Sequence, residues 1–378
     1  MTHAFVGKVK VVWGAYHGDQ CTPKIPTLQH WKGHAMNSGL HTPLCDLLGC
    51  RYPIVQAGMG GVARSALAAA VSAAGGLGCL GMVRESPELI AREIGLVRGR
   101  TDQPFAVNLI PAATEANLFS EELAACRESG VQTLVYFWDV VPEAVAQARA
   151  AGMRVLYQVG SLAAAQEAEA AGAAAIIAQG VEAGGHVHGG VSSLVLLPQV
   201  AAGVNIPVIG SGGFATGAGL VAALALGAQG IHCGTAFLAT QESFAHEIHK
   251  QRVVEAECDQ TVHTDAYAIN WPKGSPVRVL ANAMTEELGN RLFGYDPQQI
   301  AREEIAEEEG RAIYLWSTDS PLQSMTGDLQ RLAFFAGQST GHVRQIEPAA
   351  DVVARLVAEA RQVLDRMPNP SSDLQPPS

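Results

Sequence analysis

Residues 133–178, TLVYFWDVVPEAVAQARAAGMRVLYQVGSLAAAQEAEAAGAAAIIA, contain the repeating pattern that decides the fold. Three short apolar runs, at 133–137, 154–158 and 174–178, alternate with Ala-rich stretches of helical composition. Continuous apolar runs are typical of parallel strands that are buried on both faces. The step between runs is about 20 residues, the length of one compact strand–helix unit. The stretch therefore predicts consecutive βα units.

The same alternation extends along the chain in both directions. The predicted strands are Ile54–Ala57, Gly78–Gly81, Phe105–Leu109, Thr133–Phe137, Arg154–Gln158, Ala174–Ala178, Pro207–Gly210 and Gly230–Gly234. Eight such units favour a closed (β/α)8 barrel of the TIM type, an α/β fold. An open doubly wound parallel sheet is the alternative.

Residues that start and stop helices lie between these runs. Ser161 and Thr216 are predicted to cap helices that end at Gly172 and Gly227. Pro142 fits the first turn of a further helix, because its missing N–H is not needed there. These signals support helices as the connections between parallel strands.

The character of the chain changes after Ala239, where charged stretches at 302–304 and 307–309 predict helices. We therefore expect a mostly helical insertion or lid after strand eight. A last amphipathic helix, from about Pro348 to Arg366, is predicted to close the barrel. The predicted domains are a leader of unknown role at 1–35, the barrel at 36–239 and 341–366, the insertion at 240–340 and a disordered tail at 367–378.

Composition excludes several classes of protein. The 378 residues include 36 acidic and 25 basic side chains, for a formal charge of -11, which argues against binding to nucleic acid or to an anionic membrane. No apolar run reaches the ~18–20 residues of a membrane span. The seven Cys are scattered and form no CxxC pair, so we expect reduced thiols in a cytoplasmic protein. The scattered His residues form no metal-binding pattern, and we predict no metal.

Two glycine-rich segments follow the seventh and eighth predicted strands. Ser211, Gly212 and Gly213 follow the seventh strand, and Gly234 and Thr235 follow the eighth. Glycines let backbone N–H groups approach a phosphate, and barrels often hold a phosphate at this pair of loops. The alternative is that these glycines only make tight turns. Two such segments at the right strands favour a phosphate-bearing cofactor.

A glycine-dense loop after the sixth strand, QGVEAGGHVHGG at 179–190, carries His186 and His188. An imidazole at the rim of a barrel suits a general acid or base, or a hydrogen-bond partner for an anion. The spacing of two residues does not choose between the two His. A solvated loop His is the alternative.

The segment after the first strand, QAGMGG at 56–61, has glycines at Gly58 and Gly60 that would let the backbone lie against a flat ring. Met59 offers a soft apolar contact there, although a turn with a core Met is an equal alternative. Asn108 ends the third strand and would hydrogen-bond a heterocycle or cap a turn. We expect His232 to face the helix layer and Cys233 to be a buried structural thiol.

These residues together resemble a known family. The motifs are QAGM at 56–59, EAGGH at 182–186, GSGGF at 210–214, GTAFL at 234–238 and FAGQSTG at 335–341. They resemble the nitronate monooxygenases, formerly called 2-nitropropane dioxygenases, which are flavin mononucleotide (FMN) enzymes on a TIM-type barrel. The resemblance covers residues from about 40 to 365.

The resemblance implies roles for particular residues. His186 matches the catalytic His of the family. His188 is a departure from the family pattern, and His188 and Met59 are the candidate substrate contacts. The implied FMN-binding residues are Gly58, Met59, Asn108, Gln158, Gln179, Gly180, Gly185, Ser211, Gly212, Gly213, Gly234, Thr235, Gln338 and Ser339.

The implied reaction is oxidative denitrification, in which an alkyl nitronate, or a nitroalkane, and dioxygen give an aldehyde or ketone and nitrite. We expect small-molecule partners only, and a homodimer is compatible with the sequence. One alternative is an FMN-dependent enoyl-ACP reductase that uses NAD(P)H, since that family shares the EAGGH segment and the Gly-Gly loop. An alternative of another class is a non-redox barrel that binds a phosphate.

Overall fold

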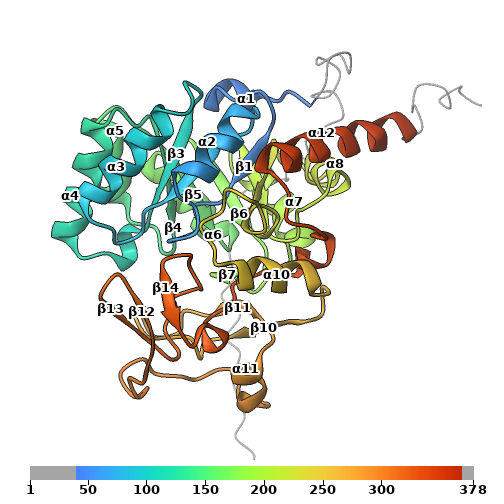
Figure 1. Cartoon of the computed structure of the whole chain (residues 1–378). Helices are drawn as coiled ribbons and strands as arrows, with labels where there is room; N and C mark the ends of the chain where they lie inside the picture. Colours follow the sequence, from blue (N-terminus) through green and yellow to red (C-terminus); the bar gives the residue numbers. More distant parts are fainter. Residues whose placement is uncertain (1–39, 368–378) are drawn as a thin grey trace, which may run out of the picture. The chain divides into compact units, whose positions relative to one another are not determined.

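The computed structural model describes residues 40–367, so the predicted leader and almost all of the predicted tail lie outside the described residues. Within this range eight parallel strands form one sheet in the order β1-β9-β8-β6-β5-β4-β3-β2 (Figure 1). The strands are β1 (Ile54–Gln56), β2 (Gly78–Gly81), β3 (Phe105–Leu109), β4 (Thr133–Phe137), β5 (Arg154–Val159), β6 (Ala175–Gln179), β8 (Val208–Ser211) and β9 (Gly230–Cys233).

The two end strands of this sheet meet and close it. The Leu77 N–H donates to the Ile54 carbonyl, and the Gln56 N–H donates to the Leu77 carbonyl, both at 2.9 Å. The Gln56 side chain adds two bonds across the same seam, to the N–H and the carbonyl of Cys79. The predicted (β/α)8 barrel is therefore confirmed.

Helices surround the strands, as the helix-capping and helix-ending residues of the sequence predict. Ser161 Oγ accepts the Ala164 N–H at 3.2 Å, and Thr216 Oγ1 accepts the Gly219 N–H at 3.1 Å. The barrel region contains α1 (Pro43–Leu48), α2 (Ser65–Ala73), α3 (Pro87–Arg98), η2 (Pro111–Ala113), α4 (Ala116–Glu128), α5 (Pro142–Ala150), α6 (Leu162–Ala171), α7 (Ser193–Gly203), α8 (Gly217–Ala225) and α9 (Thr235–Leu238).

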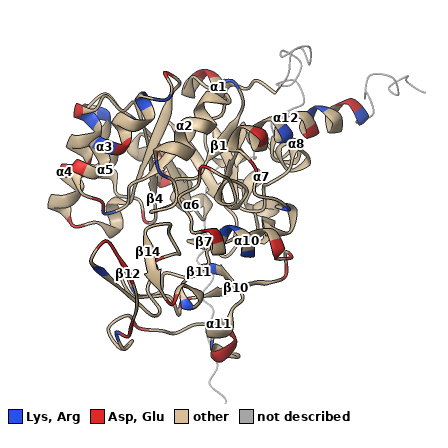
Figure 2. Ribbon diagram, in the orientation of Figure 1, with Lys and Arg blue, Asp and Glu red and all other residues tan. Residues whose placement is uncertain are grey.

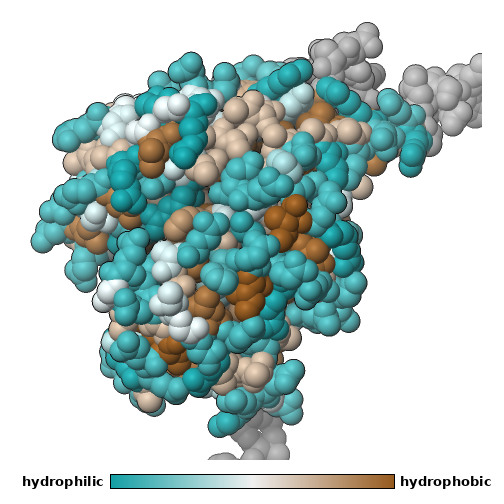
Figure 3. Space-filling model, viewed as in Figure 1, coloured by the Kyte–Doolittle hydropathy of each residue, from teal (hydrophilic) through white to brown (hydrophobic). Residues whose placement is uncertain are grey.

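Alternate residues of each strand face the interior of the barrel, because the side-chain period of a strand is two. Small and branched apolar side chains, such as Val55, Ala106 and Ile177, fill that interior in one buried cluster. Figure 2 shows many of the charged residues on the helices and on the segment after β9, whereas β1 and β4 carry none. The face drawn in Figure 3 is largely hydrophilic, with scattered apolar patches.

The segment after β9 differs from the mostly helical insertion that the sequence predicts. Its elements are α10 (Glu247–Glu255), β10 (Thr261–Thr264), β11 (Val277–Leu280), α11 (Ala283–Leu288), β12 (Glu304–Glu308), β13 (Arg311–Tyr314), β14 (Met325–Gly327), η3 (Leu329–Arg331) and η4 (Gln338–His342). In the described part of the chain these strands form two three-stranded sheets, β13-β12-β14 and β10-β11-β7, and β7 (Gly185–His186) comes from the loop after β6.

The charged stretch around residue 307 is a hairpin and not a helix for two local reasons. Glu309 and Gly310 both have positive φ, 49° and 84°, which is the geometry of a two-residue hairpin turn. Ala306 and Ile313 then bury their side chains in the core of the insertion, while Glu304, Glu307 and Arg311 stay exposed.

The last helix, α12 (Ala349–Arg366), confirms the predicted amphipathic helix and packs against α8 and α2. The Glu359 carboxylate accepts the Gly217 N–H at 2.7 Å, where α8 begins. No helix within residues 40–367 is both long enough and apolar enough to cross a bilayer. The same residues contain no group of three His, Cys, Asp or Glu side chains arranged to hold a metal.

Candidate active site

A cavity of about 770 Å³ lies at the C-terminal ends of the barrel strands, between the barrel loops and the insertion. This is the face on which TIM barrels carry their active sites. The structure brings most of the sequence-predicted residues together around it. The predicted residues that line it are Gly58, Met59, Asn108, Gln158, Gln179, Gly185, His186, Ser211, Gly212, Gly213, Gly234, Thr235 and Ser339.

The loops after β8 and β9 have the properties of an anion-binding site. We call their residues Gly212, Gly213, Gly234 and Thr235 the anion seat. Gly212 and Gly213 adopt φ of 88° and 82°, a left-handed conformation that L side chains rarely adopt. None of the hydrogen bonds of the described residues uses the N–H groups of Gly212, Gly213 or Gly234. Thr235 Oγ1 accepts the Gly337 N–H at 2.9 Å, which leaves its own hydrogen available. Free backbone N–H groups in glycine-rich loops after barrel strands commonly bind phosphate.

Polar side chains that face inward near the C-terminal ends of β3 and β5 line the cavity. Asn108 Nδ2 donates to the Val135 carbonyl at 2.9 Å. Gln158, on β5, is buried, and its amide bonds no other described residue. Side-chain amides can both donate to and accept from the polar edge of a bound heterocycle.

His186 lies on β7, opposite Val277 of β11, and its ring faces the cavity. The ring stacks on Trp271, with 3.4 Å between ring centroids and 24° between planes. Nε2 is buried and has no hydrogen-bond partner among the described residues. Burial, and then the charge of Arg84, lower the pKa of His186 well below 6.5. The imidazole is therefore neutral at neutral pH, and its Nε2 can accept a proton or donate a hydrogen bond, depending on the tautomer.

Gln179 fixes the backbone around this His. Its Nε2 donates to the His186 carbonyl at 2.9 Å, and its Oε1 accepts the His188 N–H at 3.2 Å. The structure does not bring the His188 ring to the cavity. That ring lies edge-on to Trp138, and its Nε2 is 2.9 Å from Asp139 Oδ1. The role of His188 in substrate contact thus has no geometric support here.

Two further predicted residues also lie away from the cavity lining. A Cβ on Gly180 would collide with the Glu182 carboxylate and the Ser193 N–H, so close packing explains that glycine. Gln338 is exposed, and its N–H donates to the Glu182 carbonyl at 2.9 Å. Its neighbour Ser339 does reach the cavity.

The glycines after β1 have two different explanations. A Cβ on Gly58 would collide with the Asn108 side chain, so packing within the protein requires Gly58. Gly60 lines the cavity, and no atom lies within 4 Å of a Cβ added to it. Of the two, only Gly60 matches the prediction that a flat ring rests on this backbone.

The prediction for His232 is wrong, because its ring faces the cavity and not the helix layer. Its Nδ1 is 3.0 Å from Ser211 Oγ, and burial lowers its pKa to about 4. Strand alternation carried this signal, since Ile231 and Cys233 on either side belong to the core beneath the helices. Cys233 is a buried thiol whose pKa burial raises to about 12, as predicted for a structural cysteine.

The charged part of the cavity lining has no signal in the sequence. The β2–α3 loop contributes Arg84 and Glu85, and the insertion contributes Trp271 and a group around β12 and β13 that includes Arg311. These residues come together only through the packing of the insertion on the barrel. No spacing in the sequence indicates that they share one cavity.

A TIM-type barrel with free backbone N–H groups at the ends of two neighbouring strands, and a neutral His at its mouth, is an arrangement typical of barrel enzymes. A match to the nitronate monooxygenase family spans residues 41–359, and the chain belongs to that family. It is an oxidoreductase.

Several known proteins are similar to this chain. A "(3aS,4S,5R,7aS)-5-hydroxy-7a-methyl-1-oxo-octahydro-1H-indene-4-carboxyl-CoA dehydrogenase" of Mycobacterium tuberculosis is 38% identical over 68% of this chain and 71% of that protein. A nitronate monooxygenase of Paraburkholderia phytofirmans is 32% identical over 86% of this chain and 96% of that protein.

Two solved structures are also similar to this chain over most of its length. FabK from Thermotoga maritima has a TM-score of 0.73 at 31% identity, over 86% of this chain and 98% of that one. The nitroalkane oxidase of Streptomyces ansochromogenes has a TM-score of 0.70 at 31% identity, over 85% of this chain and 99% of that one. Membership in this family of oxidoreductases sets aside the non-redox barrel.

Proposed function

We propose that the protein binds FMN and uses it to oxidise alkyl nitronates with dioxygen, giving a carbonyl compound and nitrite. The observation that carries the proposal is the free N–H groups of Gly212, Gly213 and Gly234 in the same cavity as the unpartnered Nε2 of His186. The three N–H groups fit a phosphate, and the His186 Nε2 fits the reacting end of a substrate. Family membership and the nitroalkane oxidase neighbour support the choice of substrate.

The residues of this chain would divide the work as follows. Gly212, Gly213, Gly234 and the Thr235 hydroxyl would hold the phosphate, and Gln158 would contact the polar part of the flavin. FMN supplies the redox chemistry when it is bound. His186 would hold or move a proton at Nε2, either by donating a hydrogen bond to an anionic substrate or by taking the α-proton of a neutral nitroalkane.

Oxygen uptake and nitrite release, measured together over a panel of nitronates, test this proposal. The FMN-loaded protein should consume oxygen and release nitrite with at least one alkyl nitronate. FMN should co-purify with the protein or be retained when it is added, as seen in the visible spectrum. Retained FMN with no oxygen uptake on any nitronate would overturn the reaction while leaving the cofactor in place.

A second candidate is reduction or oxidation of an acyl thioester. The similarity to the carboxyl-CoA dehydrogenase, at 38% identity, favours it, and FabK keeps the enoyl-ACP reductase alternative open. Steady-state oxidation of NAD(P)H with a crotonyl thioester distinguishes this reaction. A rapid rate in that assay, without oxygen uptake on nitronates, would select the second candidate.

A further inference from the structure

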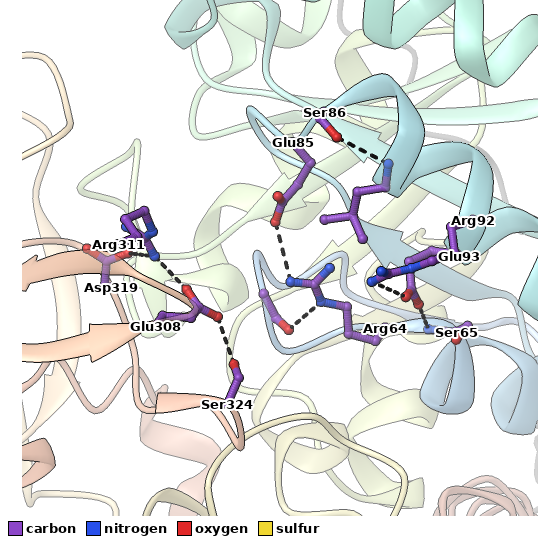
Figure 4. Close-up of polar contacts among 12 residues, drawn as sticks. Arg64, Ser65, Glu85, Ser86, Arg92, Glu93, Glu308, Arg311, Asp319 and Ser324 are labelled. Atoms are coloured by element: carbon purple, nitrogen blue, oxygen red, sulfur yellow. Dashed lines mark hydrogen bonds and ion pairs between the residues drawn. The ribbon is translucent and has the colours of Figure 1, made fainter. Parts of the chain in front are cut away.

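Three arginines line the cavity in the described part of the chain, and two of them are neutralised by carboxylates. Arg64 Nη2 lies 3.6 Å from Glu85 Oε1. Arg311 Nη2 lies 2.6 Å from Glu308 Oε2 and 3.0 Å from Asp319 Oδ1. Figure 4 shows these two groups, one on the barrel side and one on the β12–β13 hairpin. Their charges are already compensated within the protein.

The third arginine, Arg84, has a different environment. Within residues 40–367, no carboxylate oxygen lies within 4.0 Å of its guanidinium. Its Nη1 donates to the Asn270 carbonyl, and the guanidinium carbon lies 5.6 Å from the centroid of the Trp271 ring, over its face. A guanidinium has five N–H donors, so most of them remain for a ligand. Among the described residues that line the cavity, Arg84 is the arginine without a paired carboxylate.

The acids nearest to Arg84 do not neutralise it. Asp319 is engaged by Arg311, as described above. Glu122, on α4, is fully buried, and burial raises its pKa to about 8. Its carboxyl is therefore mostly protonated at neutral pH. Burial lowers the pKa of Arg84, which indicates that water stabilises its charge only in part.

The backbone holds Arg84 in place at a cost. Arg84 has a φ of 57°, in the left-handed region that residues other than Gly, Asn and Asp rarely adopt. Strained backbone of this kind is concentrated at binding and catalytic sites. The positive φ, the Asn270 contact and the Trp271 ring together fix the direction of the guanidinium before any ligand binds.

Arg84 and His186 are linked through a shared neighbour, Trp271. Trp271 contacts both side chains, through its stack with the His186 ring and through the cation above its face. The charge of Arg84 contributes to lowering the pKa of His186. An anion bound to Arg84 would therefore share one cavity with the imidazole, at the C-terminal ends of the barrel strands.

We propose that Arg84 binds the anionic oxygens of the substrate and thereby selects nitronates over neutral nitroalkanes. A nitronate shares one negative charge between two oxygens on one nitrogen, and the planar fork of a guanidinium matches that pair. This inference rests on the proposed function for its substrate, and it assigns to Arg84 a substrate-binding role.

Nitrate is the probe that tests the site without turnover, because it is a planar monoanion in which any two of the three oxygens on nitrogen present a pair like that of a nitronate. Calorimetric titration of the FMN-loaded protein with nitrate should give a measurable Kd for the wild type. Arg84→Gln should weaken that binding by roughly 10- to 100-fold, the loss expected for hydrogen bonds to a charged group. Arg311→Gln, a change of the same kind at an already paired arginine, should change it by less than about threefold.

Steady-state kinetics provide the second measurement. In Arg84→Gln the KM for a nitronate should rise by a similar factor, while kcat/KM for the matching neutral nitroalkane changes much less. FMN absorbance and the melting temperature show whether each variant is folded. If Arg84→Gln does not fold, Arg84→Asn takes its place, because Asn readily adopts positive φ.

The outcomes separate the two proposals. Absence of nitrate binding by the wild type, equal nitrate affinity in wild type and Arg84→Gln, or an equal loss in Arg311→Gln would each overturn the role of Arg84. Nitrate binding that depends on Arg84 in a protein that oxidises no nitronate would support the anion site and reject the proposed reaction.

Discussion

Replacing Gly212 by Ala tests whether the anion seat holds the FMN phosphate. Gly212 has a φ of 88°, and an added Cβ would lie 3.0 Å from the Gly180 carbonyl oxygen and 3.2 Å from the Ala183 nitrogen. Left-handed backbone costs an L residue about 1–2 kcal/mol, and crowding against backbone adds about 1 kcal/mol. We expect Gly212→Ala to lower the free energy of unfolding by about 2–3 kcal/mol.

Gly152 provides the matched control. It has a φ of 80°, and nothing lies within 4 Å of an added Cβ. Gly152→Ala should therefore lose only the backbone part, about 1–2 kcal/mol, with no effect on the cofactor. Urea denaturation of the apoproteins measures both changes.

The affinity for FMN then distinguishes a structural glycine from a phosphate-binding one. If the Gly212 N–H binds the phosphate, its displacement removes a charge-assisted hydrogen bond, and the Kd for FMN should rise roughly 10- to 100-fold. Titration of the apoprotein followed by flavin fluorescence gives this value. An FMN Kd in Gly212→Ala equal to that of Gly152→Ala would refute the assignment of the seat.

Three further changes have specific expected results. His186→Ala should reduce turnover of neutral nitroalkanes by ~10²–10⁴-fold and that of preformed nitronates much less, and equal losses would exclude a base role. Gln179→Ala removes two hydrogen bonds to the backbone of His186 and His188, so thermal or urea unfolding should show a loss of about 1–3 kcal/mol; an unchanged stability would contradict this anchoring. Burial raises the pKa of Glu122 from 4.5 to about 8. Between these two pH values the Glu122 carboxylate must therefore take up a proton when the protein folds. Relative to Glu122→Gln, the wild type should lose up to about 1.4 kcal/mol of stability per pH unit as pH rises from 4.5 to 8, measured by urea unfolding across that range, and parallel curves would refute the shift.

The insertion shows where sequence patterns did not suffice. The charges at 302–309 suggested a helix, but Glu309 and Gly310 make a hairpin turn that pairs β12 with β13. The turn was visible in principle as a Gly between two segments that alternate buried and exposed residues. The short length of both strands made that alternation weak beside the density of charge.

Local patterns of the chain by themselves determined the barrel and the glycine-rich loops after two of its neighbouring strands. Strand runs, helix caps and glycines act within about 20 residues of one another, because each βα unit forms from neighbouring residues. These local patterns predict Gly212, Gly213 and Gly234 at the ends of two strands, and the structure shows that β8 and β9 are neighbours in the sheet.

Only the tertiary structure decided what surrounds the substrate end of the cavity. Arg84 and Trp271 are 187 positions apart, and the contact between them depends on how the insertion packs over the barrel mouth. The charge state of His186 follows from that same packing, since burial and the cation act through space and not along the chain. Such long-range contacts have no period or spacing in the sequence from which they could be read.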